Sequence, residues 1–73
     1  MINQTFENVT PETLCAVLPL GVVVPEQDSY EVHVNISDFE GCSIEFSFTG
    51  FYKVSQAEAF SALDTLRAAD PRY

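Results

Sequence analysis

His33 is the only histidine in the chain, and histidine is the side chain best suited to proton transfer near neutral pH. Glu31 and Asn35 share its face of a predicted strand, and Glu45 lies diagonally across on the next strand, so a histidine–carboxylate pair for acid–base catalysis is conceivable. No nucleophile stands at a recognisable spacing from this pair, and a small three-stranded sheet offers little concave pocket. We therefore expect a protein that is not an enzyme.

Two groups of acidic residues could attract a hard cation such as calcium. These are Glu26, Asp28 and Glu31, and the pair Asp38 and Glu40. The segment around the second pair is too short for a twelve-residue calcium loop, and no Asp-x-Asp-x-Asp-Gly ladder occurs. One histidine and two distant cysteines lack the spacing of a zinc site, and the glycines do not form a phosphate-binding loop. We expect neither a metal nor a cofactor.

The cysteines bear on the cellular compartment. We predict that Cys15 and Cys42 are two small, partly buried hydrophobic side chains. The alternative, a disulfide between them, would stabilise the fold but needs an oxidising compartment. The N-terminus lacks the basic and apolar regions of a signal peptide. The longest apolar run, residues 20–24, is far shorter than the roughly 20 residues that span a bilayer. These features predict a cytoplasmic protein without membrane contact.

Charge is distributed unevenly along the 73 residues. Eleven acidic and three basic residues give a net charge of −8. Residues 1–52 contain eight of the acids and no base, whereas residues 53–73 contain three of each and are neutral. Such charge can serve solubility alone, or it can form a negative surface that steers toward a basic partner. Direct nucleic-acid binding is not expected, because phosphate contacts need clustered Lys and Arg.

The elements that must position these charges are those of one small domain covering residues 1–73, since 47% of the chain is hydrophobic. Thr10 and Pro11 start a short helix that ends near Leu18, before Pro19. Residues 20–24 are rich in β-branched side chains and are bounded by prolines, which predicts a short edge strand. Residues 25–28 form a turn.

Strict alternation then predicts a β-hairpin. Tyr30, Val32, Val34 and Ile36 share one face of the first strand, and Cys42, Ile44, Phe46 and Phe48 share one face of the second. A turn over residues 38–41 that pairs Asp38 with Cys42 places Val34 opposite Phe46. Val34 and Phe46 should both be buried, with Glu31, His33 and Glu45 on the solvent-facing side.

A second helix should follow residues 51–54 and end before Pro71. Ser55 and Glu58 form a capping box at its start, with Val54 and Ala59 as a hydrophobic staple. Ala59, Phe60, Leu63 and Leu66 form an apolar stripe that can cover the inner face of the sheet. The predicted fold is therefore α+β: a three-stranded antiparallel sheet with a short N-terminal and a longer C-terminal helix, in the order α-β-β-β-α.

The candidate functional surface is acidic. Its predicted partner-binding residues are Glu26, Asp28, Glu31, Asp38, Phe39, Glu40 and Glu45. Alternate residues on a strand lie about 6.6–6.8 Å apart, similar to successive phosphates along a nucleic-acid strand. An acidic rim on a rigid sheet can therefore occupy a basic groove in place of nucleic acid. Phe39, at the turn, is either a contact anchor or folds back on the sheet edge.

In size, acidity and lack of catalytic residues, the chain resembles small phage-encoded inhibitors of the anti-CRISPR type, several of which mimic DNA. The resemblance extends to overall character and not to a motif. It implies a bacterial cytoplasm and, as partner, a basic protein or nucleoprotein such as a CRISPR effector complex, whose basic channel the acidic face would block. The alternatives are an antitoxin-like or immunity-like partner of a basic toxin or nuclease, and a homo-oligomeric subunit. The free protein would be a monomer or a homodimer.

Overall fold

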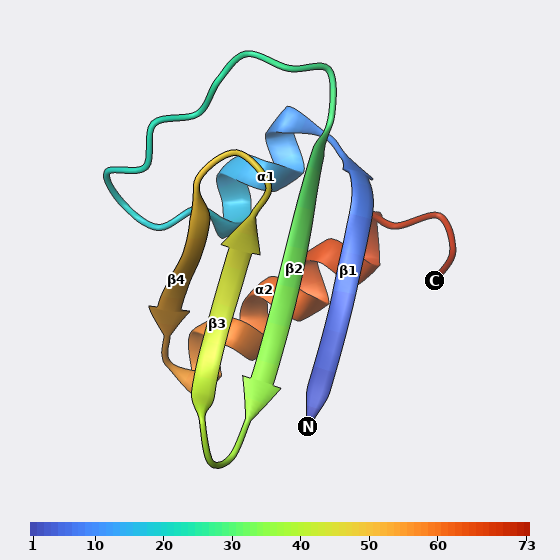
Figure 1. Ribbon diagram of the computed structural model, residues 1–73. Helices are drawn as coiled ribbons and strands as arrows, with labels where there is room; N and C mark the ends of the chain where they lie inside the picture. Colours follow the sequence, from blue (N-terminus) through green and yellow to red (C-terminus); the bar gives the residue numbers. More distant parts are fainter.

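The computed structural model describes residues 1–73, which form four strands and two helices. In chain order these are β1 (Ile2–Val9), α1 (Pro11–Val17), β2 (Tyr30–Ser37), β3 (Gly41–Phe46), β4 (Gly50–Val54) and α2 (Gln56–Ala69). The strands form one antiparallel sheet in the order β1-β2-β3-β4. The fold is thus α+β as predicted, with four strands instead of three and the order β-α-β-β-β-α (Figure 1).

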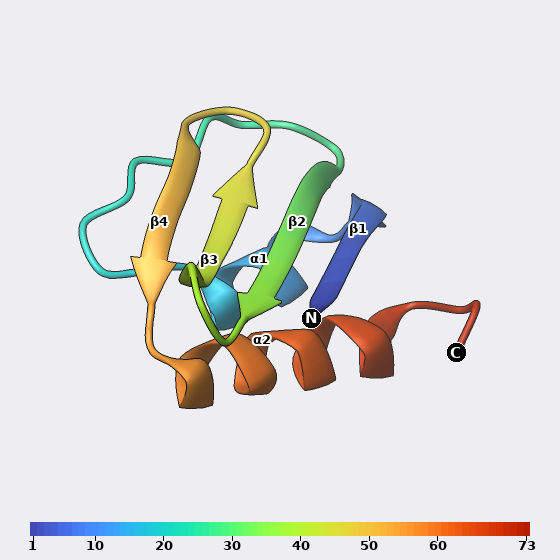
Figure 2. The ribbon, with the colours of Figure 1, turned by 60° about the horizontal axis from the view of Figure 1, so that its bottom comes forward.

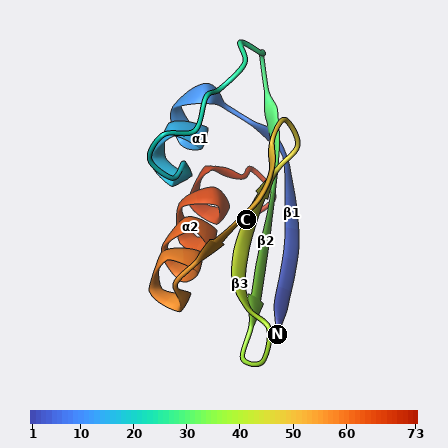
Figure 3. The ribbon, with the colours of Figure 1, turned by 60° about the vertical axis from the view of Figure 1, so that its left-hand side comes forward.

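Both helices lie on the same side of the sheet, and its other side is uncovered (Figure 3). Helix α2 crosses the sheet from the β4 edge toward the β1 edge, as Figure 2 shows. Its buried face consists of Ala59, Ala62, Leu63 and Leu66. Phe60, which the predicted stripe included, is 39% exposed, and Ala62 is buried instead.

The first strand, β1, was not predicted, and the order that begins with a helix is wrong. Residues 2–9 do alternate, but the inward position between Ile2 and Phe6 is the polar Gln4, which weakens the pattern. Gln4 is satisfied by the last helix: Arg67 donates to its Oε1 from Nε and Nη2, at 3.1 and 2.9 Å. The strand therefore depends on a polar contact that spans most of the chain.

The predicted strand over residues 20–24 is also wrong. This segment is part of the long connection between α1 and β2, and it forms no backbone pairing with the sheet. Leu20 and Val23 are almost fully exposed. The position beside β2 that an additional strand would take is occupied by β1, so β-branched composition alone does not make this segment a strand.

The hairpin between β2 and β3 is present, but its register differs by two residues from the prediction. Ser37 pairs with Gly41 and Val32 with Phe46, so Val34 faces Ile44 and not Phe46. The reason is the Ser37 side chain, whose Oγ accepts hydrogen bonds from the backbone N–H groups of Phe39 and Glu40. Because a shift of two residues keeps every side chain on its face, the predicted inward and outward sets are unchanged.

Strand β3 ends at Phe46, and the chain turns over residues 47–49 into β4. Gly50 starts β4 with a φ of +109°, which favours glycine. Phe51 lies opposite Glu45 and Lys53 opposite Ser43. The segment predicted to lead into the last helix is therefore the outer strand of the sheet.

Both helix starts agree with the sequence. The Oγ of Thr10 accepts a hydrogen bond from the backbone N–H of Thr13 at 3.3 Å. In α2 the capping box is complete, since Glu58 N–H donates to Ser55 Oγ at 3.1 Å and Ser55 N–H to the Glu58 carboxylate at 3.2 Å. Neither helix is long and apolar enough to cross a bilayer.

The core lies between the helices and the inner face of the sheet. Val34 and Phe46 are both 0% exposed, which confirms the prediction that they are buried. The Phe46 ring lies 5.7 Å from that of Phe48 and 6.0 Å from that of Tyr52, centroid to centroid. Phe46 therefore joins β3, the following turn and β4 in one aromatic cluster.

Replacing Phe46 with alanine should lower the free energy of unfolding by about 3–5 kcal/mol, because a large buried ring is exchanged for a cavity. In so small a domain this loss can abolish folding. Phe51→Ala is the matched control: that ring is 63% exposed, and its loss should cost less than about 0.5 kcal/mol. Urea unfolding, monitored by circular dichroism, measures the free energy of unfolding of both variants. Equal losses in the two variants would contradict this description of the core.

Candidate functional site

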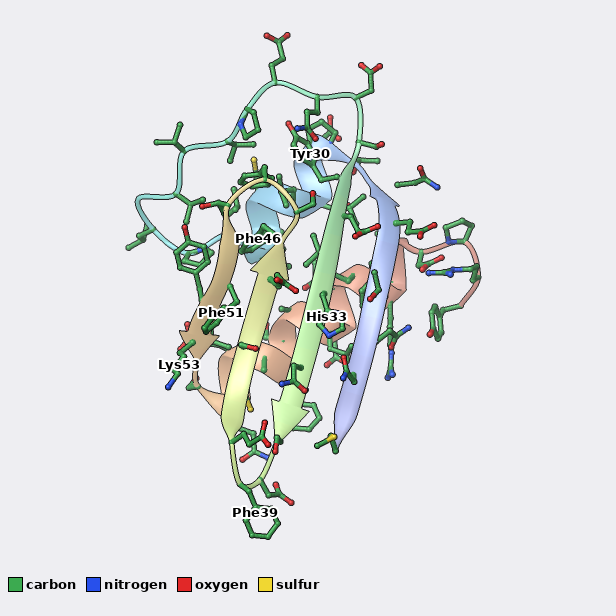
Figure 4. The ribbon with its side chains drawn as sticks, in the orientation of Figure 1. Tyr30, His33, Phe39, Phe46, Phe51 and Lys53 are labelled. Carbon is green, nitrogen blue, oxygen red and sulfur yellow. The ribbon has the colours of Figure 1, made fainter.

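The uncovered side of the sheet is the candidate functional surface, here called the open face. It consists of the outward side chains of the four strands: Asn3, Thr5, Glu7, Glu31, His33, Asn35, Ser43, Glu45, Phe51 and Lys53. The strand register arranges most of them in rows. Figure 4 shows His33, Phe51 and Lys53 on this side.

The central row contains the only histidine. Thr5, His33, Glu45 and Phe51 follow one another across the four strands. His33 Nδ1 and Thr5 Oγ1 are hydrogen-bonded at 2.7 Å, whereas no hydrogen bond joins His33 to Glu45. The row borders a shallow depression of about 300 Å³. Such a surface suits contact with another macromolecule better than enclosure of a small ligand.

Two acids extend the open face toward the start of β2. Glu7 and Glu31 line a second shallow depression, of about 390 Å³, together with Gln27, Ser29 and Ser47. Glu31 lies diagonally across from Glu45, a relation in which side chains are roughly 7–8 Å apart. The two depressions therefore follow one another along β2 and together contain three carboxylates.

Glu26 and Asp28 lie in the connection that leads into β2, and one buried side chain holds this connection in place. The Tyr30 hydroxyl donates a hydrogen bond to the carbonyl of Pro25 at 2.6 Å and accepts one from the N–H of Gln27 at 3.1 Å. Tyr30 itself is packed against Phe48, with 5.7 Å between ring centroids. The two acids are thus attached to the core through one residue.

The turn at the other end of β2 consists of Asp38, Phe39 and Glu40. It lies about 25 Å from the start of this eight-residue strand. All three are exposed, and Phe39 is 100% exposed. The alternative that Phe39 folds back on the sheet edge is therefore wrong. Its side chain points away from the molecule (Figure 4).

Very few of the charges neutralise one another. The single ion pair joins Arg72 to Asp70, at 2.7 Å. The hydrogen bond from the Arg72 side chain lowers the pKa of the Asp70 carboxyl below its ordinary value. The pair therefore stabilises the fold above the carboxyl's pKa in the unfolded chain, and this contribution is lost as pH falls through the lowered pKa. The other ten carboxylates have no ion-pair partner.

Two of the three cations lie away from the open face. Arg67 is held on the helix side by Gln4 and lies over the Tyr73 ring, 5.5 Å from its centroid. Only Lys53 is on the open face. Seven acids and this lysine lie on the open face or at the two ends of β2, giving −6, whereas the other four acids and both arginines give −2.

The structure brings together only some of the residues predicted to bind a partner. Glu31 and Glu45 lie on the open face as expected, while the remaining five form its two ends. Sequence reasoning missed Glu7 and Lys53, because β1 and β4 were not recognised as strands. For Glu7 a signal was available, because Asn3, Thr5 and Glu7 alternate with neighbours that are more buried.

The largest cavity, about 490 Å³, lies at the edge of the sheet beside β1 and reaches the open face at Glu7. It is bordered by the end of β1, the start of α1 and the end of α2, with Phe6, Asn8, Thr10, Leu66 and Arg72 in its wall. Asn8 has a φ of +59° at the irregularity in the β1–β2 pairing. No three His, Cys, Asp or Glu side chains come together as metal ligands anywhere in the structure.

Both cysteines are free, with Cys15 exposed on α1 and Cys42 buried in β3. We expect a thiol reagent such as DTNB to modify Cys15 at once in the native protein, and Cys42 only after unfolding. A reductant should leave the melting temperature unchanged, and so should a chelator. A melting temperature that falls with reductant would instead indicate the Cys15–Cys42 disulfide.

Comparison of the chain with models of known protein families, with curated proteins and with solved structures gives no significant match.

Proposed function

We propose that the chain is a protein-binding inhibitor whose acidic side occupies the basic, nucleic-acid-binding surface of a partner such as a CRISPR effector complex. The observation that carries the proposal is the one-sided distribution of unpaired carboxylates. Ten of the eleven acids have no ion pair, and seven of these ten lie on the open face or at its two ends. A surface with seven acids and a single cation, Lys53, keeps most of its negative charge available for a basic partner.

The sheet gives these charges a fixed spacing. Glu31 and Glu45 are diagonal neighbours at roughly 7–8 Å, which is close to the separation of successive phosphates in a nucleic-acid strand. Backbone pairing on both sides of β2 and β3 holds their main chains in place. Folding already fixes the positions of these two main-chain segments. Binding a partner therefore loses less conformational entropy than it would if the charges lay on a flexible segment.

An antitoxin-like protein that neutralises a basic toxin or nuclease would use the same surface, so the two functions differ in the partner alone. Self-association is favoured by a different observation, the exposure of Leu20 and Val23. Light scattering during size-exclusion chromatography distinguishes a monomeric inhibitor from a homodimer. Loss of a dimer in Leu20→Asp would assign it to this segment.

Two sets of substitutions with equal change in charge test the proposal. The first is Glu7→Gln, Glu31→Gln and Glu45→Gln on the open face, and the second is Glu12→Gln, Glu58→Gln and Asp64→Asn on the helices. Glutamine can also serve in a capping box, so the second set should fold. Each triple variant and the unaltered protein are immobilised and used to capture proteins from bacterial lysate. Duplex and single-stranded DNA are added as competitors.

The open-face set should weaken binding to the captured partner roughly 3- to 100-fold, because exposed charge pairs contribute about 0.2–1 kcal/mol each. Most of the effect should lie in the association rate, and the difference should shrink as salt rises from 50 to 300 mM, where screening lengths fall below about 10 Å. The helix set should bind like the unaltered protein. Equal effects of both sets would show that the charge serves solubility only.

DNA competition tests the class of partner. Added DNA should release a captured protein whose nucleic-acid-binding surface is the one covered. A purified CRISPR effector complex provides the direct form of this test: the chain should reduce its binding to labelled target DNA, and the open-face set should restore that binding. A partner that stays bound at saturating DNA would contradict nucleic-acid mimicry and favour the antitoxin-like function.

A further inference from the structure

The turn at the end of the β2–β3 hairpin exposes an aromatic ring that the fold does not use. Phe39 is 100% exposed, whereas the other phenylalanines of the sheet hairpins range from buried to 63% exposed. It lies between two exposed acids, Asp38 and Glu40. Because the ring is fully exposed, it contributes no buried area to the core and is free to contact a partner.

Hydrogen bonds to the Ser37 side chain bridge this turn. Ser37 is buried, and its Oγ accepts from the N–H groups of Phe39 and Glu40 at 3.3 and 3.2 Å. Gly41, with a φ of +85°, closes the turn by pairing with Ser37. The ring and its two flanking carboxylates are therefore presented on a short, closed turn, and binding would need to order little beyond the side chains.

The sequence of groups at the tip is anion, aromatic ring, anion. A single-stranded nucleic acid presents the same sequence of groups, since each unstacked base is flanked by two backbone phosphates. Proteins bind single strands with a cationic groove that follows the backbone and with aromatic side chains on which the bases stack. In a duplex the bases are stacked inside, and the phosphates are the groups presented outward, so a projecting ring has no counterpart there.

We propose that the hairpin tip occupies a groove for single-stranded nucleic acid on the partner, with Phe39 stacked where a base would stack. Asp38 and Glu40 would then meet the Lys and Arg side chains that otherwise contact the phosphates. The inference rests on the proposed function and narrows its partner class to proteins that bind single-stranded DNA or RNA.

The test uses the partner purified from the pull-down and a fluorescein-labelled oligo(dT) of about 15 nucleotides. The chain should displace this oligonucleotide, and an unlabelled oligo(dT) should compete with the chain better than a duplex of equal length. Phe39→Leu should weaken displacement roughly 5- to 100-fold, in line with the loss of one stacked base, whereas Phe39→Trp should retain it. Phe60→Leu is the control: this partly exposed phenylalanine lies on α2, away from the open face, and the variant should displace the oligonucleotide like the unaltered chain.

Folding does not confound the result, because Phe39 makes no core contact and both variants should melt like the unaltered protein. A partner without affinity for oligo(dT) would overturn the inference. Full displacement by Phe39→Leu would overturn it too, since a leucine that suffices indicates an apolar socket and not a stacking platform. In either case, weaker binding by the open-face set would still uphold the proposed function. If that set also binds normally, the proposed function fails as well.

Discussion

The structure depends on covering one face of a single sheet. Val32, Val34 and Phe46 are completely buried because α1 and α2 lie against the same side of the strands. In 73 residues there is no second layer to cover the other side. The uncovered side must therefore be polar, and its side chains are free of packing constraints. That freedom is what allows carboxylates to gather there without partners of opposite charge.

The contacts of the two arginines follow from the same constraint, namely that only one side of the sheet is covered. Arg67 binds the inward-facing Gln4 at the edge of the covered layer, and Arg72 neutralises Asp70 just after α2. Arg67 joins the last helix to β1, Arg72 pairs locally after the end of α2, and neither is among the residues of the open face. The separation of charge between the two sides is therefore a product of the fold, and it would not be recovered from net charge alone.

Local signals in the sequence predicted the elements that depend on local interactions. Thr10, Ser55 and Glu58 cap the helices as expected, and the alternation through β2 and β3 assigned each side chain to the correct face. β1 escaped prediction because Gln4 interrupts its alternation and its side-chain partners, Arg67 and Tyr73, are more than 60 residues away. The register was missed because the Ser37 hydroxyl, and not the turn composition, decides where the hairpin closes. The acids of the candidate site that lie on β2, on β3 and at the ends of β2 could be predicted from the sequence. Their grouping with Glu7 and Lys53 could not, because it depends on β1 and β4, which were not predicted.

The contact between Gln4 and the C-terminal segment has a consequence for the order of folding. Gln4 is hydrogen-bonded to Arg67 and to the Tyr73 hydroxyl, and the Phe6 ring lies 6.4 Å from that of Tyr73. Contacts at such large sequence separation close late, because the intervening chain must first lose its freedom. During synthesis, β1 is made before α2 and the C-terminal segment that it contacts. The β2–β3 hairpin can form meanwhile from local contacts, and the contacts of β1 with Arg67 and Tyr73 follow.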